Sequence, residues 1–192
     1  EYWKSTEHNI MAYVALRNFG RLNGQSNYVT QAEKIKTLIK SPAIWNGTYF
    51  NQGPYDTRGA TDVQAYATML LGSAYYNALT WAEQKLKLSL NFNYQTITGF
   101  DFNDDLDTIW LEGTLQMAFA FYKSSPTISA NAYKASFYYN EANKVIQADG
   151  SLLLAIQRGS ATPFWTLEPW HAIAPTSWLI LYNYKFNPLT LY

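Results

Sequence analysis

Cysteine is absent from the 192-residue sequence, and so is any run of eighteen apolar residues. Without cysteine there is no disulfide framework, no thiolate nucleophile and no cysteine-ligated zinc site. Without a long apolar run, no segment is expected to cross a membrane. The chemistry available is therefore that of carboxylates, imidazoles, amides, hydroxyls and aromatic rings.

Net charge is also lacking, because 14 Lys and Arg residues balance 14 Asp and Glu residues. A neutral chain has no overall field that attracts nucleic acid or an anionic membrane, so we expect neither as a partner. Only 15% of the residues are charged, whereas 16 Tyr, 7 Trp and 10 Phe are present. A surface rich in aromatic rings and uncharged polar groups suits a neutral ligand with many hydroxyl groups.

Apolar periodicity predicts seven helices of two alternating kinds. Inner helices, apolar on nearly every side, are expected at 6–19, from 61 onward, at 108–123 and at 173–186. Outer helices, apolar along one stripe, are expected at 28–40, 76–88 and 130–146. Strand-like alternation is confined to short pieces such as 89–94 and 151–156, so no large sheet is expected. The predicted fold class is all-α, a single helical domain over residues 1–192.

The inner helices begin near residues 6, 61, 107 and 173, a spacing that fits a helical hairpin plus a long loop. Repeated hairpins with a buried inner member are typical of an α/α toroid or solenoid. Four inner helices cannot close a ring of six hairpins. We therefore expect a partial toroid, the C-terminal part of a longer one, in which a missing N-terminal half or a partner chain completes the ring.

Acidic residues concentrate where the predicted inner helices begin. Eight of the 14 lie there: Glu7, Asp62, Asp101, Asp104, Asp105, Asp107, Glu112 and Glu168. Parallel inner helices open their N-terminal ends onto one face, so these side chains are expected to converge on that face. The two histidines of the chain, His8 and His171, accompany them.

Aromatic residues lie beside these acids in the sequence. Together with Glu168, five of them are predicted to bind substrate: Tyr49, Tyr55, Trp110, Trp165 and Trp170. Sugar rings pack their C–H faces on aromatic planes, and sugar hydroxyls bond to carboxylates. The shared face of the inner helices is therefore predicted to hold a carbohydrate-binding cleft.

The same acids also have structural interpretations. Acids in a first helical turn complement the helix dipole, so Glu7 and Asp62 could simply stabilise helix starts. The segment from Asp101 to Glu112 has the oxygen-ligand spacing of a calcium loop, but Leu106 stands where that loop requires Gly. Capping does not need an imidazole, so the histidines favour a chemical role. We predict neither a metal nor a cofactor.

Four segments on the predicted inner helices carry a family resemblance: STEHNI with the following AY and AL (5–16), GFDFN (99–103), IWLEGTLQMA (109–118) and TSWLIL (176–181). Together they resemble a bacterial α/α-toroid family akin to the six-hairpin glycosidases, polysaccharide lyases and sugar epimerases. The resemblance implies a toroid and a carbohydrate-type cleft, with Glu7, His8 and Glu112 at its motif positions. We favour a secreted or periplasmic location.

The leading functional hypothesis is glycoside hydrolysis by paired carboxylates. Glu112, one turn inside a buried helix, is predicted to be the acid because desolvation raises its pKa. Glu7 or Asp62 would be the base, and His8 and His171 would orient substrate hydroxyls.

Two other functions remain open. His8 and His171 could act as the acid and base of a sugar epimerase or polysaccharide lyase. A non-catalytic helical domain could instead bind a glycan or a protein through its aromatic face. We predict that residues 5–9 line a cleft rather than only cap a helix, with Glu7 and His8 facing a pocket shared with Glu112 and at least two aromatic residues.

Overall fold

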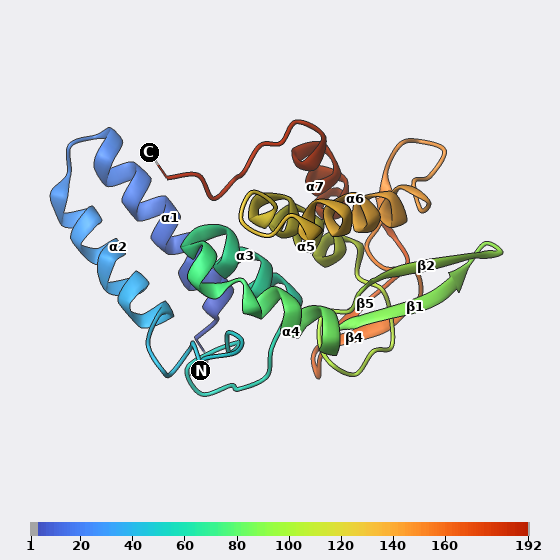
Figure 1. Ribbon diagram of the computed structural model, residues 1–192, viewed down its shortest axis with the longest axis horizontal. Helices are drawn as coiled ribbons and strands as arrows, with labels where there is room; N and C mark the ends of the chain where they lie inside the picture. The colour runs from blue at the N-terminus through green and yellow to red at the C-terminus, as the bar shows by residue number, and fades with distance from the viewer. Residues whose placement is uncertain (1–3, 192) are drawn as a thin grey trace.

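The computed structural model describes residues 4–191 and contains all seven predicted helices within that range (Figure 1). They are α1 (Thr6–Leu22), α2 (Ser26–Ile39), α3 (Thr61–Leu71), α4 (Asn77–Lys85), α5 (Leu111–Ser124), α6 (Ala130–Asn143) and α7 (Ile173–Asn183). One 3-10 turn, η1, lies between α3 and α4 at Ser73–Tyr75. None of the helices in this part of the chain is both long and apolar enough to span a bilayer.

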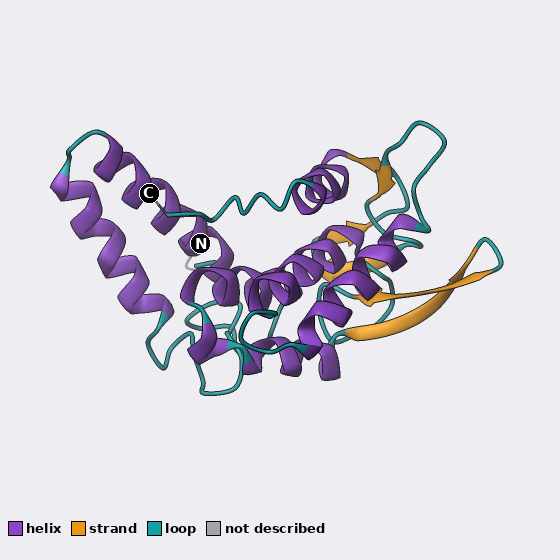
Figure 2. Ribbon diagram, turned by 45° about the horizontal axis from the view of Figure 1, so that its top comes forward, coloured by secondary structure: helices purple, strands orange, loops and turns teal. Residues whose placement is uncertain are grey.

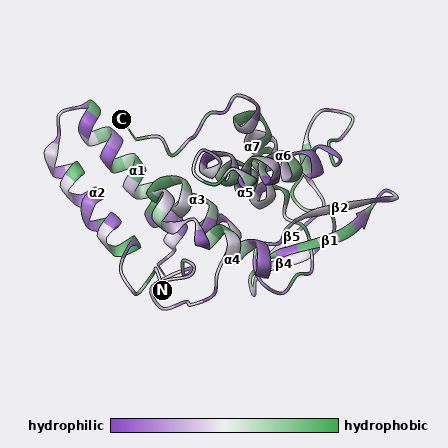
Figure 3. Ribbon diagram, in the orientation of Figure 1, coloured by the Kyte–Doolittle hydropathy of each residue, from purple (hydrophilic) through white to green (hydrophobic). Residues whose placement is uncertain are grey.

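The four inner helices lie side by side in the order α1, α3, α5, α7. The outer helices α2, α4 and α6 each pack against the inner helix that precedes them. In Figure 3, hydrophilic and hydrophobic residues alternate along α2 at the edge of the molecule, as one-sided burial requires. The alternation of inner and outer helices is therefore present.

Burial separates the central inner helices from those at the ends of the row. Helices α3 and α5 are buried on most sides, because each has inner neighbours on both flanks. Helix α1 was predicted to be buried all round, and this is wrong: Met11 is 38% exposed and Phe19 is 48% exposed. Ile180 of α7 is likewise 52% exposed. An end position in the row leaves one flank of a helix in solvent.

The predicted fold class, an all-α toroid, is wrong. Within residues 4–191, six strands form three two-stranded antiparallel sheets, so the fold is mixed, although helices dominate. Figure 2 shows the strands gathered at the end of the molecule opposite α1 and α2. The row of inner helices stays open, and the chain after α7 runs back towards α1, where Asn18 Nδ2 donates to Thr190 O at 2.9 Å.

The longest sheet is a hairpin of β1 (Lys87–Phe92) and β2 (Gln95–Phe100). Asn93 and Tyr94 form its two-residue turn with φ of 48° and 63°, the left-handed geometry that matches the strand twist. The predicted helix at 76–88 ends early, at Lys85, because Leu88, Leu90 and Phe92 alternate with polar residues and enter β1.

Two smaller sheets come from the segment between α6 and α7. Strand β3 (Leu152–Leu153) pairs with β6 (His171–Ala172), and β4 (Gly159–Thr162) pairs with β5 (Trp165–Leu167). The N–H of Leu111 donates to Leu154 O at 3.0 Å, which ties this segment to the start of α5. The two small sheets thus border the N-terminal ends of the inner helices.

Candidate active site

A cavity of about 260 Å³ lies where the N-terminal ends of α1, α3 and α5 meet. We call it the acidic cavity. It is lined by Ser5, Glu7, His8, Gln52, Asp62, Val63, Phe102, Trp110, Glu112, Gln116, Thr162 and Trp165. The structure therefore brings Glu7, His8, Asp62 and Glu112 together with three aromatic rings, as predicted from the helix starts.

The starts of α1 and α5 are capped without help from Glu7 or Glu112, whereas Asp62 Oδ1 accepts the N–H of Val63 in the first turn of α3. Ser5 Oγ accepts from the N–H of His8 at 3.2 Å. Backbone carbonyls cap the others: Thr61 N donates to Phe102 O, and Leu111 N donates to Leu154 O, both at 3.0 Å. Orphan N–H groups at a helix start need only one acceptor each. The carboxylates of Glu7 and Glu112 are consequently left free of a capping role.

Glu112 is the carboxyl group best placed to change protonation near neutral pH. Burial, and next the charge of Glu7, raise its pKa to about 7. A hydrogen bond from Gln116 Nε2 to Glu112 Oε1, 3.0 Å long, works in the opposite direction because it favours the ionised form. Glu112 can therefore exist as an acid or as a carboxylate at physiological pH.

Of the other two cavity acids, Asp62 is more buried than Glu112 and Glu7 is less buried. Asp62 is 6% exposed, and burial, followed by the charge of Glu7, raises its pKa to about 8 even though its Oδ1 accepts the N–H of Val63. Glu7 retains 31% of its side-chain exposure. Burial raises the pKa of Glu7, and His8, whose Nε2 lies 3.7 Å from Glu7 Oε2, lowers it. At neutral pH, Asp62 holds a proton and Glu7 is the acid most accessible to water.

Aromatic rings form one wall of the acidic cavity. Phe102 meets Trp110 edge-to-face at 5.2 Å and Trp165 edge-to-face at 5.8 Å. Trp165 is 44% exposed, so its ring presents an open surface beside the carboxyls. Its place is set by β5, which pairs with β4. A wall of rings facing carboxyl groups can pack a sugar ring and bond its hydroxyls.

Four of the predicted substrate-binding residues lie outside the acidic cavity. Tyr49 stacks on Trp81 at 4.1 Å, and its hydroxyl donates to Thr57 O. Glu168 forms an ion pair with Arg158 at 3.1 Å. Tyr55 and Trp170 are 86% and 70% exposed. Their segments do reach the acidic cavity, through Gln52 and Trp165, but these four side chains do not line it.

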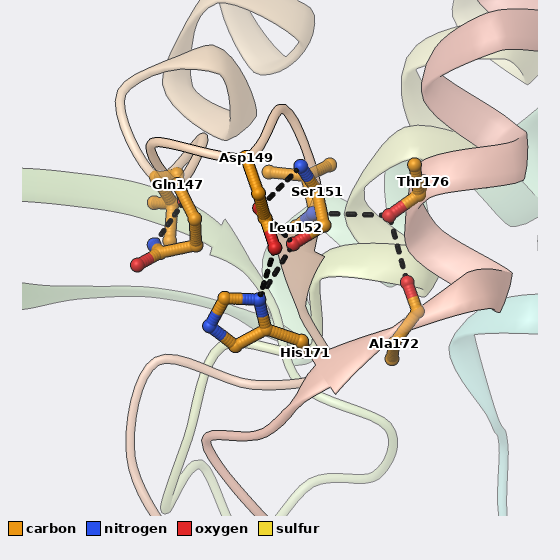
Figure 4. A network of polar contacts seen from close by, with 8 residues as sticks. Gln147, Asp149, Ser151, Leu152, His171, Ala172 and Thr176 are labelled. Carbon is orange, nitrogen blue, oxygen red and sulfur yellow. Dashed lines mark hydrogen bonds and ion pairs between the residues drawn. The ribbon is translucent and has the colours of Figure 1, made fainter.

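His171 also lies outside the acidic cavity, in a second cavity bordered by Asp149 and Ser151 (Figure 4). Its Nδ1 lies 2.7 Å from Ser151 Oγ and 3.1 Å from Asp149 Oδ2. Ser151 Oγ and Ser151 N both donate to Asp149 Oδ1, so the carboxylate is the common acceptor. Both neighbours contact the same ring nitrogen, whereas a catalytic triad places Ser and Asp on opposite nitrogens. None of the described residues of α7 lines the acidic cavity either.

Three aspartates of the segment with calcium-loop spacing form a separate group, with ligand atoms of Asp101, Asp105 and Asp107 within 4.8 Å of one another. Asp101 accepts the N–H groups of Phe102, Asp107 and Thr108. Asp107 accepts from Ser160 N at 2.9 Å. Glu112, the twelfth residue of the loop pattern, faces the acidic cavity and does not belong to this group.

The sequence prediction missed four polar residues of the acidic cavity: Gln52, Gln116, Thr162 and Ser5, the last of which was considered only as a helix cap. Gln116 could have been found, because it lies four residues after Glu112 and side chains at that spacing share a helix face. Gln52 and Thr162 come from loops and a short strand, for which the sequence holds no periodic signal.

The chain matches no protein-family model and no curated protein sequence. A function must therefore be inferred from the acidic cavity itself.

Proposed function

We propose that the chain acts on a glycan and hydrolyses a glycosidic bond in the acidic cavity. The observation that carries this proposal is the placement of Glu112, whose pKa is about 7, in one cavity with a second, more exposed carboxylate, Glu7. Glycoside hydrolysis needs a carboxylic acid that is still protonated near neutral pH and a carboxylate that is not. The resemblance of the sequence motifs implies a carbohydrate-type cleft, which is in keeping with a glycan as the substrate.

Glu112 is assigned as the general acid, which gives its proton to the glycosidic oxygen as the bond to the sugar carbon breaks. Glu7 is assigned as the carboxylate that removes a proton from the attacking water or attacks the sugar carbon directly. Asp62 is less suited to be the base, because its pKa of about 8 keeps it protonated at neutral pH. A neutral Asp62 can donate a hydrogen bond to a substrate oxygen.

The remaining lining residues fit substrate positioning. The exposed ring of Trp165 offers a stacking surface, and His8, 76% exposed in its side chain, can bond a hydroxyl at the mouth. The two-histidine epimerase or lyase has less support, since two imidazoles that act on one sugar carbon must face the same cavity. His8 and His171 line different cavities.

The proposal is tested by incubating the protein with a panel of neutral oligosaccharides and polysaccharides and separating the products by chromatography. We expect at least one substrate to release sugar, and we expect Glu112→Gln to stop the release while the melting temperature is retained. If no substrate releases sugar and a glycan still binds to Glu112→Gln, the chain is a binding domain and the hydrolase proposal fails.

A further inference from the structure

Two tight turns beside the acidic cavity share an unusual composition. Residues 53–56 read Gly-Pro-Tyr-Asp, and the first and last of them exchange two backbone hydrogen bonds of 3.1 Å. Residues 162–165 read Thr-Pro-Phe-Trp and form the tip of the β4–β5 hairpin, where the first residue pairs with the last. Proline presets the backbone of a tight turn, but neither turn requires an aromatic residue after the proline. The two aromatic residues therefore call for another explanation.

Both aromatic rings at the turn tips face solvent. Tyr55 is 86% exposed and Phe164 is 98% exposed, so neither ring contributes to the core. Trp165, which follows Phe164, is 44% exposed and lines the acidic cavity. Exposed aromatic rings beside a cavity are available to pack against a ligand that extends out of it.

The segments that carry these turns also border a second cavity of about 260 Å³, which we call the neighbouring cavity. It is lined by Arg58, Asn103, Asp105, Ser160, Thr162 and Pro163. Thr162 lines the acidic cavity as well. On the other segment, the N–H of Gln52, a residue of the acidic cavity, donates to Arg58 O at 2.7 Å. The same two segments thus border both cavities, which places the cavities next to each other.

Arg58 is the residue of the neighbouring cavity best placed to bind a ligand. Its side chain is 55% exposed, so a ligand can reach it. Its Nε and Nη2 donate to the carboxylate of Asp56 at 2.9 and 2.6 Å, which fixes the guanidinium in place. A guanidinium has five N–H donors, so this pairing leaves others for the hydroxyl oxygens of a sugar. Ser160 and Asp105, by contrast, are already bonded to each other.

Resting on the proposed function, we infer that the substrate is a chain of at least two sugar units, one in the acidic cavity and the next in the neighbouring cavity. Arg58 donates to hydroxyl groups of the second unit, and the rings of Tyr55 and Phe164 pack against the chain at the two turns. A sugar unit suits this place because it offers both hydroxyl groups and C–H faces. These three residues thus determine specificity for chain length.

The test measures Kd for cello-, malto-, xylo- and manno-oligosaccharides of one to four units, in a Glu112→Gln background that leaves them intact. In one series, we expect the second unit to lower Kd by about tenfold or more, because hydrogen bonds to a charged donor are gained. Arg58→Ala should reduce this gain to about threefold or less while the Kd of the single sugar stays within about twofold. Tyr55→Ala and Phe164→Ala, which remove exposed rings and should fold normally, should each reduce the gain from the second and later units.

Tyr94→Ala is the matched control. Tyr94 is an exposed aromatic residue at the tip of the β1–β2 hairpin and lines neither of the two cavities, so its loss should keep the whole gain. The inference is overturned if no oligosaccharide binds, if the second unit brings no gain in any series, if all three groove variants keep the gain, or if Tyr94→Ala loses it as well.

Failure of the inference and failure of the proposed function give different results. A chain-length gain that the three variants lose, without any release of sugar by the wild-type protein, would overturn the proposed hydrolase and leave the inference standing. Release of sugar without a chain-length gain would do the reverse.

Discussion

The cavity acids, Glu7, Asp62 and Glu112, and the loop acids, Asp101, Asp105 and Asp107, differ in what they bond to. The loop acids bond to the protein itself: Asp101 accepts three backbone N–H groups, Asp107 accepts that of Ser160, and Asp105 accepts the hydroxyl of Ser160. In the described chain, Glu7 and Glu112 accept none, and Asp62 accepts that of Val63. Hydrogen bonds from the backbone to a carboxylate fix the shape of a loop, so the loop acids have a structural role. The oxygens of the cavity acids remain largely available to a ligand.

The pKa values do not separate the two groups, which makes the hydrogen bonds the better guide. Burial raises the pKa of Asp101 to about 7, although N–H groups of Thr108 and Phe102 pull it down. Glu112 also has a pKa of about 7. A raised pKa therefore indicates burial in both groups. The candidate site is distinguished instead by the carboxylate oxygens of Glu7 and Glu112, which accept no backbone N–H group in the described chain.

The largest expected effect is on the rate of glycan hydrolysis, which should depend on the cavity acids and not on the loop acids. Glu112→Gln should lower the rate of glycan hydrolysis by about 10²–10⁴-fold, because the general acid is lost. Asp105→Asn, a similar loss of one carboxylate in the loop group, should keep the rate within about threefold. Initial rates on the substrate found in the panel measure both. A comparable loss in Asp105→Asn would break the division between the groups.

The next effect is on the free energy of unfolding, which should depend more on the loop acids than on the cavity acids. Asp101→Ala leaves three backbone N–H groups without their acceptor in a site that is 0% exposed. We expect the free energy of unfolding to fall by on the order of 3 kcal/mol. Glu112→Ala removes a desolvated carboxyl group that caps nothing, so its loss should stay below about 1 kcal/mol. Urea unfolding measures both variants, and the reverse order would contradict the assignment.

A smaller effect is expected from pH. The folded-state pKa of Asp62 is raised to about 8, so between about pH 4 and pH 8 the folded chain holds a proton that the unfolded chain releases. Its contribution to the free energy of unfolding is therefore fully present below about pH 4 and is lost progressively as the pH rises to about 8. Asp62→Asn should flatten this decline in urea unfolding curves taken at several pH values. An unchanged slope would show that Asp62 is not the group that titrates.

The sequence predicted the helices well because their signals are local. Long amphipathic segments such as Thr6–Leu22 and Leu111–Ser124 show their period within a few turns. The pairing of β3 with β6 was missed because it is not local: Leu152–Leu153 meets His171–Ala172 only after the seventeen residues between them fold back. Two-residue strands have no period to detect, so an all-α fold class was predicted in error.

The same reasoning explains which site residues were found. Glu7, Asp62 and Glu112 follow from one rule, that inner helices open their N-terminal ends onto one face. His171 also precedes an inner helix, but its strand pairs with Leu153, and it then bonds to Asp149 and Ser151 instead. Tyr49 could not be assigned from sequence, since its stacking on Trp81 depends on how a loop folds onto α4.

The smallest effect on stability is expected at the first turn of α1. Ser5 keeps the cap in Glu7→Gln and His8→Ala, so we expect the free energy of unfolding of either variant to change by less than about 0.5 kcal/mol. The charge of Glu7 raises the pKa of both Asp62 and Glu112, so Glu7→Gln should move the alkaline limb of any remaining pH–rate profile to lower pH. Glycan affinity should fall in both variants. Thermal melting and ligand binding, measured on the same two variants, test this prediction. A clear loss of stability with intact ligand binding would show that residues 5–9 have a structural role, as the loop acids do.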